Sequence, residues 1–376
     1  MNDRPILVTG AAGHVGANVL HRLVADGHRV RALLRSGETD ESVRVLEQAG
    51  VPVERAIGDL RAPETLRQAF QDCRAIVHVA SMVSTIDGTP EHRRTIYETN
   101  VIGTRHLLRE ARAAGVERTV VTSSFSAVGY DLDDPSIPAD ETFAFYPFHR
   151  AMPYERSKVL QEQEVLKAVV DGQDALILTS TAVVGGHDYF PSRMGRTLAR
   201  FANGELNAYV PGGFEFVAAR DIADGHVRAL EKGRAGQKYV IATQFMTLDD
   251  IFDIFEELTG QPRPKLRIQP ELMLPIAEAM SAFMTRFRPQ APQLLTPGAI
   301  RRLKLRRHAD TSKARGELGF RPSSIEKAFA EAYAFHHSRG AITNPDAKAP
   351  PADALAAVSA KPGAVTTAAP ATAIHA

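Results

Sequence analysis

The sequence has little of what marks a secreted, zinc-binding or membrane-spanning protein. It contains one cysteine, Cys73, and no tryptophan in 376 residues, so an intrachain disulfide is impossible and no thiol cluster can bind zinc. Its histidines show no metal-ligand spacing, and we expect no metal site. There is no leader of charged and then apolar residues and no apolar run of 18 residues. We therefore expect a cytoplasmic protein without stable membrane insertion.

The chain also lacks an excess of charge of either sign. Lys and Arg number 45 against 44 Asp and Glu, which gives a formal net charge of +1. This balance gives no reason to expect a nucleic acid or an anionic membrane as a partner. With 44% hydrophobic and 24% charged residues, the composition is that of an ordinary globular protein. The length allows one large domain or two.

Short β-rich apolar runs alternate with helical patterns through the first half of the chain. "PILVTG", "AIVHVAS", "RTVVTSS" and "ALILTSTAVVG" are the strand-like runs, and amphipathic segments separate them. This alternation predicts an α/β fold, a doubly wound parallel sheet of the Rossmann type with helices on both faces. The nearly continuous apolar strands fit a sheet that is covered on both sides.

The second half is less regular and predicts a smaller, mostly C-terminal α/β substrate domain. A segment rich in Gly, Pro and aromatic residues (185–216) has the composition of a lid or substrate segment, and the end of the chain is rich in Ala, Pro and Thr. A segment with few large apolar side chains cannot order itself. We assign residues 1–182 and about 216–235 to the dinucleotide-binding domain. Residues 183–215 and 236–340 form the substrate-binding domain, and 341–376 a disordered tail.

One apolar segment, 271–287, allows two interpretations. Its large apolar residues recur at helical spacing and form one stripe: Leu272, Ile276, Met280, Phe283 and Phe287. The segment is too short and too interrupted to span a bilayer. We favour a packed helix that lines the substrate side; the alternative is a monotopic membrane anchor.

"VTGAAGHVG" places Gly10, Gly13 and Gly16 directly after the first strand and at the start of the first helix. A tight turn without Cβ atoms lets backbone amides and the helix dipole hold a pyrophosphate. The strand before and the helix after are the context that this mechanism requires. The alternative is a glycine-rich turn without a ligand.

The ends of the second and third strands indicate which cofactor binds. Arg35 follows the second strand, and no carboxylate follows until Glu38. A guanidinium suits a 2′-phosphate, whereas an acidic residue would accept the ribose hydroxyl of NAD. We therefore expect NADP, with NAD possible, unless Arg35 is a plain exposed arginine. After the third strand, Asp59 could accept from the adenine amino group and Leu60 could pack the ring; the alternative for Asp59 is a helix cap near Pro63.

"YERSK" holds Tyr154 and Lys158 four positions apart on a helix that Pro153 helps to start, so both lie on one helix face. Such a pair is expected by chance roughly 0.2 times in this chain. A phenol near its usual pKa of ~10 is a poor acid–base group at neutral pH. An ammonium beside it would lower the phenol pKa toward the working range.

Seven motifs then occur in an order that resembles the extended short-chain dehydrogenases/reductases, over about residues 4–335. They are "TGAAGHVG" (9–16), "GDL" (58–60), "HVAS" (78–81), "ETNVIGT" (98–104), "VTSSFSAVG" (121–129), "YERSK" (154–158) and "FVAARDIADGH" (216–226). The chain is most similar to the dihydroflavonol-reductase and 3β-hydroxysteroid-dehydrogenase-like branch. It is also similar to proteins labelled hopanoid-associated sugar epimerases.

The resemblance implies roles for particular residues. Tyr154 and Lys158 would be the acid–base pair, with Lys158 also on the nicotinamide ribose. Asn100 would support a proton relay, or only bridge backbone or cap a helix, and Ser124, or its neighbour Ser123, would bind the reacting carbonyl. A homodimer would form through helices around 98–114 and 154–170. The remaining cofactor contacts implied are Gly10, Gly13, His14, Val15, Gly16, Arg35, Asp59, Leu60, Val79, Ala80, Ser81 and Thr181.

Departures from neighbouring branches indicate the substrate. The 4,6-dehydratases of the family carry Asp-Glu where this chain has Phe125 and Ser126, and UDP-sugar epimerases usually carry an Arg where it has Phe214. Aromatic and Met groups would form an apolar pocket. Other rings precede the tyrosine at Phe143, Phe145 and Tyr146, and the expected substrate residues are Met82, Phe125, Phe148, Phe190 and Phe214.

We therefore expect an NADP-dependent oxidoreductase that acts on a small hydrophobic or aromatic molecule. It would reduce a ketone, or oxidise the secondary alcohol, by hydride transfer with Ser-Tyr-Lys acid–base catalysis. The alternative is an NAD-dependent nucleotide-sugar epimerase with no net redox. A non-catalytic cofactor sensor is a third interpretation, but a sensor has no need of a proton donor such as Tyr154.

Overall fold

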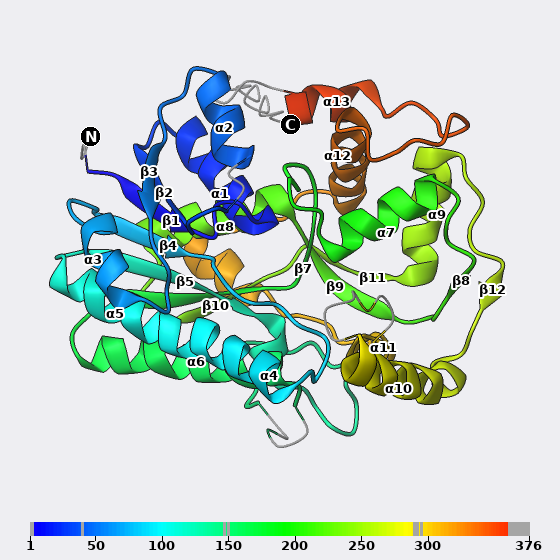
Figure 1. Ribbon diagram of the computed structural model, residues 1–376, viewed down its shortest axis with the longest axis horizontal. Helices are drawn as coiled ribbons and strands as arrows, with labels where there is room; N and C mark the ends of the chain where they lie inside the picture. Colours follow the sequence, from blue (N-terminus) through cyan, green and yellow to red (C-terminus); the bar gives the residue numbers. More distant parts are fainter. Residues whose placement is uncertain are drawn as a thin grey trace, which may run out of the picture.

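The computed structural model describes residues 4–38, 41–145, 148, 151–288, 293 and 296–359, and a seven-stranded sheet forms its centre (Figure 1). Its strands are β1 (Ile6–Thr9), β2 (Val30–Leu34), β3 (Glu54–Ile57), β4 (Ala75–His78), β5 (Arg118–Ser124), β6 (Ala175–Ser180) and β10 (Lys238–Ile241). The order is β10-β6-β5-β4-β1-β2-β3, and each neighbouring pair is parallel. The predicted doubly wound parallel sheet is confirmed.

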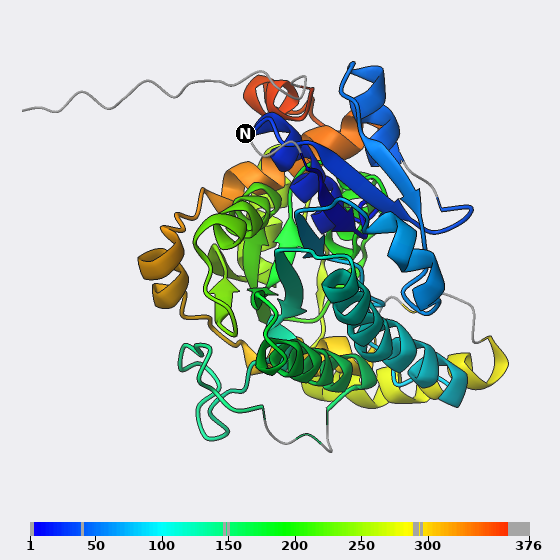
Figure 2. The same ribbon diagram turned by 90° about the vertical axis from the view of Figure 1, so that its left-hand side faces the viewer.

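Helices cover both faces of this sheet (Figure 2). Along β1, Ile6 and Val8 join one apolar cluster and Leu7 joins the other, because successive side chains of a strand point to opposite faces. The first cluster includes α1 (His14–Ala25), α2 (Glu41–Gln48) and α8 (Ala219–Lys232); the second includes α3 (Leu66–Ala69), α5 (Gly103–Ala113) and α6 (Pro153–Val170). Shorter elements beside them are η1 (Pro63–Thr65), α4 (Pro90–Tyr97), η2 (Glu98–Ile102) and η3 (Phe125–Ala127).

A smaller sheet, in the order β11-β9-β7, lies beside the central one. Its strands are β7 (Ala182–Val184), β9 (Gly213–Ala218) and β11 (Gln244–Thr247), and β8 (Ala208–Tyr209) pairs with β12 (Leu266–Arg267). The helices α7 (Arg193–Ala202), α9 (Leu248–Thr259) and α12 (Ile325–Ser338) share one apolar cluster with it, and η5 (Ala314–Leu318) packs beneath the central sheet. Strand β10 falls in the predicted substrate domain, yet it pairs with β6. That boundary was therefore wrong by one strand.

The prediction of a packed apolar stripe on α10 (Pro270–Phe287) was wrong. The five side chains of the stripe are 53–67% exposed. The helix packs instead through Met273, Leu274 and Ala277 on a cluster that includes α11 (Pro297–Leu305). Thr285 does border a cavity with Met82, so α10 lies beside the expected substrate residues. Among the described helices, none is long and apolar enough to cross a membrane.

The predicted disorder of 341–376 was wrong for its first half. Lys348 donates a backbone hydrogen bond to the Thr259 carbonyl (2.9 Å), and the Tyr333 hydroxyl donates to the Lys348 carbonyl (2.6 Å). The chain ends its described part in α13 (Ala352–Ser359), which packs on α12. These bonds order a segment that has few large apolar side chains. Residues 360–376 lie outside the described part of the chain.

Candidate active site

The glycine turn between β1 and α1 has the backbone that a dinucleotide requires. Gly10 has φ +68°, and a Cβ there would lie 2.8 Å from the backbone nitrogen of Ala80. A Cβ at Gly16 would overlap the carbonyl oxygen of Gly10. Gly13 is the N-cap of α1 and provides no side-chain cap. The turn is therefore held close to the end of β4, and its residues fit a pyrophosphate bound by backbone amides at a helix N-terminus.

A buried hydrogen-bond chain fixes the end of β4 against this turn. The Thr9 hydroxyl accepts from the backbone nitrogens of Val79 and Ala80 (both 3.1 Å), so its own proton goes to Nδ1 of His78 (2.8 Å). Nε2 of His78 then donates to the Thr104 hydroxyl (3.0 Å). Burial, and to a lesser degree the charge of the lysine on α6, lower the pKa of His78 to about 3. This histidine is therefore neutral and structural.

The predicted cofactor contacts after β4 and at α1 differ in whether their side chains are free to bind a ligand. Oγ of Ser81 is buried and has no hydrogen-bond partner among the described residues, so it can bind a ligand. Val15 packs into the apolar clusters, and Nε2 of His14 lies 3.1 Å from the Gly186 carbonyl. Residues 14–16 could therefore hold a cofactor through their backbone. The Thr181 hydroxyl has one long contact, 3.5 Å, to a carbonyl.

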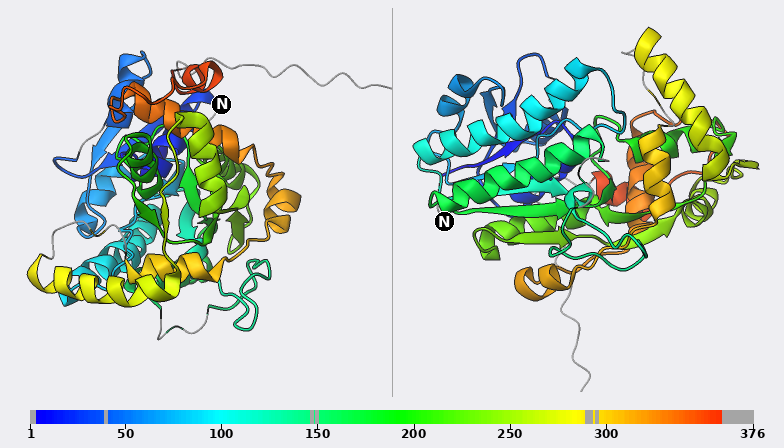
Figure 3. Two further views of the ribbon diagram at one scale, coloured as in Figure 1. Left: turned by 90° about the vertical axis from the view of Figure 1, so that its right-hand side faces the viewer. Right: turned by 90° about the horizontal axis from the view of Figure 1, so that it is seen from below.

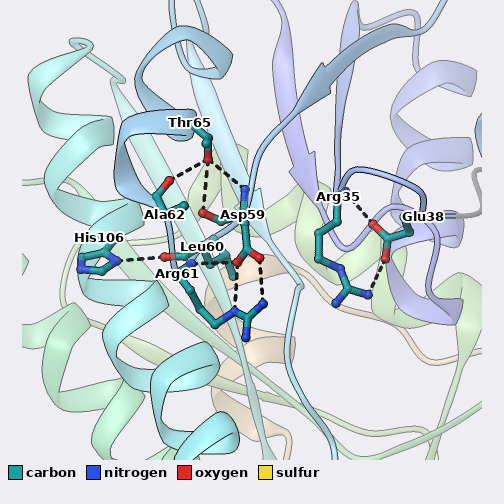
Figure 4. Close-up of polar contacts among 8 residues, drawn as sticks. All are labelled: Arg35, Glu38, Asp59, Leu60, Arg61, Ala62, Thr65 and His106. Atoms are coloured by element: carbon teal, nitrogen blue, oxygen red, sulfur yellow. Dashed lines mark hydrogen bonds and ion pairs between the residues drawn. The ribbon is translucent and has the colours of Figure 1, made fainter.

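Arg35 lies in a cavity of about 450 Å³ at the ends of β2 and β3 (Figure 4). Its backbone nitrogen donates to Oε2 of Glu38 (2.9 Å), and Nη2 donates to Oε1 (3.2 Å). The Arg35 side chain is 66% exposed. Arg35 therefore faces solvent at the place where a ribose phosphate would be recognised, but Glu38 competes for it.

Asp59 lines the other side of this cavity, and Leu60 follows it in the chain (Figure 4). Asp59 accepts from the backbone nitrogen (2.9 Å) and Nη2 (3.0 Å) of Arg61, and these bonds lower the pKa of Asp59. The carboxylate therefore does not cap the helix at Pro63, which was the alternative. Leu60 is 7% exposed and packs against α5. Arg61 gives the cavity a second guanidinium, which the sequence motifs did not indicate.

Tyr154 lies in the first turn of α6 and is 7% exposed. Its phenol lies beside the side chain of Ser124, at the end of β5. Ser123 points away, because its hydroxyl donates to Oε1 of Glu162 (2.5 Å). Neighbouring residues of a strand face opposite sides of the sheet, so the geometry favours Ser124 as the serine beside the phenol.

The electrostatics of Tyr154 differ from the prediction. Burial raises the pKa of Tyr154, although the hydrogen bond with Ser124 and the charge of Arg302 lower it. Lys158 is 2% exposed and donates to the Thr122 carbonyl (2.8 Å), and burial lowers the pKa of Lys158 to about 7. The expected lowering by Lys158 does not dominate, because desolvation disfavours both charges. The protein groups alone keep the phenol protonated at neutral pH.

Asn100 links the segment after β4 to the catalytic helix. It lies in the π-helical turn η2, a type of turn that is frequent at functional sites, and it is fully buried. Its Oδ1 accepts from the Met82 nitrogen (2.7 Å), and its Nδ2 donates to the Met82 carbonyl (3.1 Å) and to Oγ of Ser157 (2.9 Å). Oγ of Ser157 donates to the Tyr154 carbonyl (2.7 Å). The side chain therefore bridges backbone, as in the alternative interpretation.

The five expected substrate residues do not form one pocket. Met82 borders a cavity of about 240 Å³ beside α4 and α10. Phe125 is 9% exposed, and the guanidinium carbon of Arg307 lies 4.5 Å from the centre of its ring. Phe214 packs against the α10–α11 cluster. Phe148 is 40% and Phe190 71% exposed, and exposed rings give little wall to a pocket. Tyr146 lies outside the described residues.

Two arginines near Tyr154 were missed by sequence reasoning. Nε of Arg302, on α11, donates to Oε1 of Glu155 (2.9 Å), the residue after the tyrosine. Nη2 of Arg302 lies 2.9 Å from the same Oε1 and forms an ion pair with it. Nε of Arg307 is buried and has no hydrogen-bond partner among the described residues. Arg307 donates to the carbonyls of Val128 (2.9 Å) and Gly129 (2.6 Å). A cluster of basic residues at 301–307 is the only signal in the sequence.

A second missed cluster lies behind the nucleotide turn. Asp188 is buried with its Oδ1 3.9 Å from Nδ1 of His14 and its Oδ2 3.4 Å from Nε2 of His336. The carboxylate also accepts from the backbone nitrogen of Ser192 (2.9 and 2.8 Å). It therefore joins α1 to the start of α7 and to α12. Asp188 and His336 are 148 positions apart in the sequence, and no local pattern connects them.

Comparisons with known proteins agree with this geometry. The sequence profile of the NAD dependent epimerase/dehydratase family matches residues 6–242. Sterol demethylase protein B of Methylococcus capsulatus is 41% identical over 336 residues, which cover 89% of this chain and 99% of that protein. A putative dihydroflavonol 4-reductase of Synechocystis sp. is 33% identical, over 89% and 95%. A 3 beta-hydroxysteroid dehydrogenase/Delta 5-->4-isomerase of Mycobacterium tuberculosis is 29% identical, over 89% and 90%.

A solved structure has the same fold. The crystal structure of gox2253 superposes with a TM-score of 0.76 at 30% identity, over 90% of this chain and 100% of that chain. The chain therefore belongs to the NAD-dependent epimerase/dehydratase family, the extended short-chain dehydrogenases/reductases. It is an NAD(P)-dependent oxidoreductase, and a nicotinamide cofactor, when bound, supplies or accepts the hydride.

Proposed function

We propose that this member of the NAD-dependent epimerase/dehydratase family interconverts a ketone and a secondary alcohol on a hydrophobic, steroid-like molecule. The observation that carries the proposal is the buried phenol of Tyr154, which lies beside Ser124 and one helical turn from Lys158. Relatives whose names refer to sterols and to a hydroxysteroid match nearly the whole chain.

The raised pKa of Tyr154 supports ketone reduction near neutral pH. In that direction the phenol donates its proton to the carbonyl oxygen as the hydride reaches the carbon, and Ser124 orients the same oxygen. In the oxidative direction the phenolate must form first, so oxidation requires a higher pH. In the reductive direction, the protonated form of Lys158, present near and below pH 7, favours the phenolate that remains after proton donation.

Arg35 and Arg61 support a preference for NADP over NAD. Both guanidiniums line the cavity at the ends of β2 and β3, and a 2′-phosphate would accept from them. Without a ligand, Glu38 and Asp59 form ion pairs with Arg35 and Arg61. A bound phosphate must therefore replace the carboxylate in at least one of these ion pairs. The homodimer and the cytoplasmic location stay predictions.

A nucleotide-sugar epimerase is the less favoured alternative. Phe214 stands where epimerases of the family usually hold a diphosphate with Arg, and it packs against the α10–α11 cluster. An apolar ring in that position gives a diphosphate no hydrogen bond.

The test is NADPH consumption with steroidal and aromatic ketones, with UDP-sugars as the contrasting set. We expect turnover of a steroidal ketone and loss of at least about 10²-fold in kcat for Tyr154→Phe, because the variant cannot donate a proton. The proposal is wrong if Tyr154→Phe retains the rate. It also fails if UDP-sugars are epimerised by an enzyme that retains NAD.

A second candidate function follows from Arg302. We infer that Arg302, whose charge acts on Tyr154, can exchange its ion pair with Glu155 (2.9 Å) for a substrate carboxylate near the reacting carbon. Oxidation of an alcohol β to a carboxylate would send hydride to NADP⁺ and the hydroxyl proton to Tyr154. The resulting β-keto acid would lose CO₂, which fits a relative named for demethylation.

A comparison of a charged with an uncharged substrate distinguishes this candidate from the first. With a steroid that carries a carboxylate beside its hydroxyl, Arg302→Gln should raise KM at least about tenfold, and with the methyl ester it should not. Arg301→Gln is the matched control, since Arg301 is exposed and pairs with Glu278. Equal losses with the acid and the ester would contradict a carboxylate contact.

A further inference from the structure

The outer face of α10 is apolar and exposed. Leu272, Ile276, Met280, Phe283 and Phe287 are 67%, 58%, 55%, 53% and 63% exposed. Their spacing of three and four residues puts them on one side of the helix, which we call the α10 stripe. The fold does not use this side, because other residues of α10 pack on α11 and β9. The α10 stripe is therefore left for a partner.

Positive charge lies at the C-terminal end of the α10 stripe. Residues 261–308 contain ten Lys and Arg against two Glu, but Arg263, Arg267 and Arg302 pair with carboxylates outside this range. Arg286 and Arg288 end the helix and have no carboxylate partner in the described part of the chain. The guanidinium of Arg286 lies 5.4 Å from the ring centre of Phe287, so this cation borders the stripe directly. The partner must combine apolar and anionic groups.

We propose that the α10 stripe docks on the surface of a bilayer that contains anionic lipids. Such a helix lies in the interface plane, with its apolar side at the boundary of headgroups and acyl chains and its cations on the lipid phosphates. It binds peripherally and does not span the bilayer. The helix projects from the edge of the molecule, where a flat surface can reach it (Figure 3).

A second copy of this chain fits the same face less well. Two copies would place the same cationic helix end, Arg286 and Arg288, on both sides of the contact, and like charges repel. Five side chains on one helix are also far fewer than the roughly 20–30 residues a side of a stable protein interface. A lipid surface needs neither a complementary shape nor a large protein area.

The position of α10 gives the docking a function. Thr285 of α10 lines the same cavity as Met82, whose backbone is held by Asn100. On α11, a Cβ at Gly298 would lie 3.4 Å from the side chain of Met152, the N-cap of the helix that carries Tyr154. A docked α10 would hold this side of the enzyme at the lipid. An apolar substrate could then enter from the bilayer, a step that rests on the proposed function.

The test is flotation of the full chain with vesicles, without cofactor or substrate. Vesicles of phosphatidylcholine alone are compared with vesicles of phosphatidylcholine and phosphatidylglycerol. We expect the chain to float with the anionic vesicles. The double variant Ile276→Ser, Phe283→Ser should bind them at least about tenfold more weakly. The matched control is Leu132→Ser, Ile137→Ser, which removes two apolar side chains of 53% and 41% exposure from a loop elsewhere and should bind as wild type does.

The charges are tested in the same assay. Arg286→Gln and Arg288→Gln should each weaken binding to anionic vesicles about fivefold, since a basic residue near an anionic surface contributes about 1 kcal/mol. Neither substitution should change the weak binding to phosphatidylcholine alone. Equal losses on both kinds of vesicle would refute the assigned role of the charges.

Several results would overturn the docking. One is a wild-type chain that stays in the aqueous fraction with both vesicles; another is a double stripe variant that floats as wild type does. A third is the combination of two results: wild type does not bind vesicles, and a stripe variant is a monomer in light scattering where wild type is a dimer. The stripe would then be an interface between copies. NADPH turnover of a water-soluble ketone is measured separately. Its absence would contradict the proposed function and leave the flotation result valid.

Discussion

Replacing Lys158 by methionine should stabilise the fold while it abolishes catalysis. The amine is 2% exposed, and burial lowers its pKa from 10.5 to about 7. At about 1.4 kcal/mol per pH unit, this difference corresponds to a destabilisation of about 5 kcal/mol near pH 7. Methionine has a similar length and no charge to desolvate. The variant loses the hydrogen bond to the Thr122 carbonyl, worth about 1–3 kcal/mol, so we expect a net gain of about 2–4 kcal/mol.

The pH dependence has a definite sign. Between about pH 7 and pH 10.5 the unfolded lysine binds a proton that the folded Lys158 has released, so wild-type stability rises with pH over this window. Lys158→Met lacks this contribution. Its advantage should therefore be largest at or below pH 7 and should shrink toward pH 10.

The assay is urea unfolding of nucleotide-free protein at several pH values, together with NADPH turnover. Lys167→Met is the matched control, because Lys167 is on the same helix but 66% exposed, with a surface ion pair to Glu164; its stability should change by less than about 1 kcal/mol. If Lys158→Met is less stable than wild type at pH 7, or if its advantage does not fall with pH, the assigned cost of burying the amine is wrong.

Three further predictions concern the site and its support. Gly16→Ala should abolish NADPH binding in calorimetry, because a Cβ there overlaps the Gly10 carbonyl; normal affinity would refute the close approach. Asn100→Ala should lower kcat at least about tenfold with little change in KM, since the Met82 backbone loses two hydrogen bonds; an unchanged kcat would rule out positioning. Gly195→Ala should lower the unfolding free energy by at least about 2 kcal/mol, because its Cβ overlaps a buried Asp–His contact, and wild-type stability in urea would contradict this.

Much of the fold and site followed from short-range patterns. Alternating apolar runs predicted the parallel sheet, because a strand covered on both faces must be apolar along its length. The glycine turn was predictable because Gly10 and Gly16 leave no room for a Cβ. Tyr154 and Lys158 share a helix face through i, i+4 spacing alone. Each of these features depends on residues that are neighbours in the sequence.

The rest required the packing of distant segments. Arg302 meets Glu155 across 147 positions, and no local pattern connects them. The choice between Ser123 and Ser124 depended on which of the two hydroxyls donates a hydrogen bond to Glu162. The pKa of Tyr154 was misjudged because the lysine was treated as its main neighbour, whereas burial outweighs every nearby charge.

The sheet, the nucleotide turn and the Tyr–Lys pair can be predicted from the amino-acid order, because local sterics and helix periodicity set them. The exposure of the α10 stripe and the order of residues 341–359 depend on contacts between distant segments. Periodicity shows that a helix has an apolar side, but which surface covers that side depends on long-range packing. The pKa of a buried group also depends on long-range packing, since desolvation depends on everything that surrounds the group.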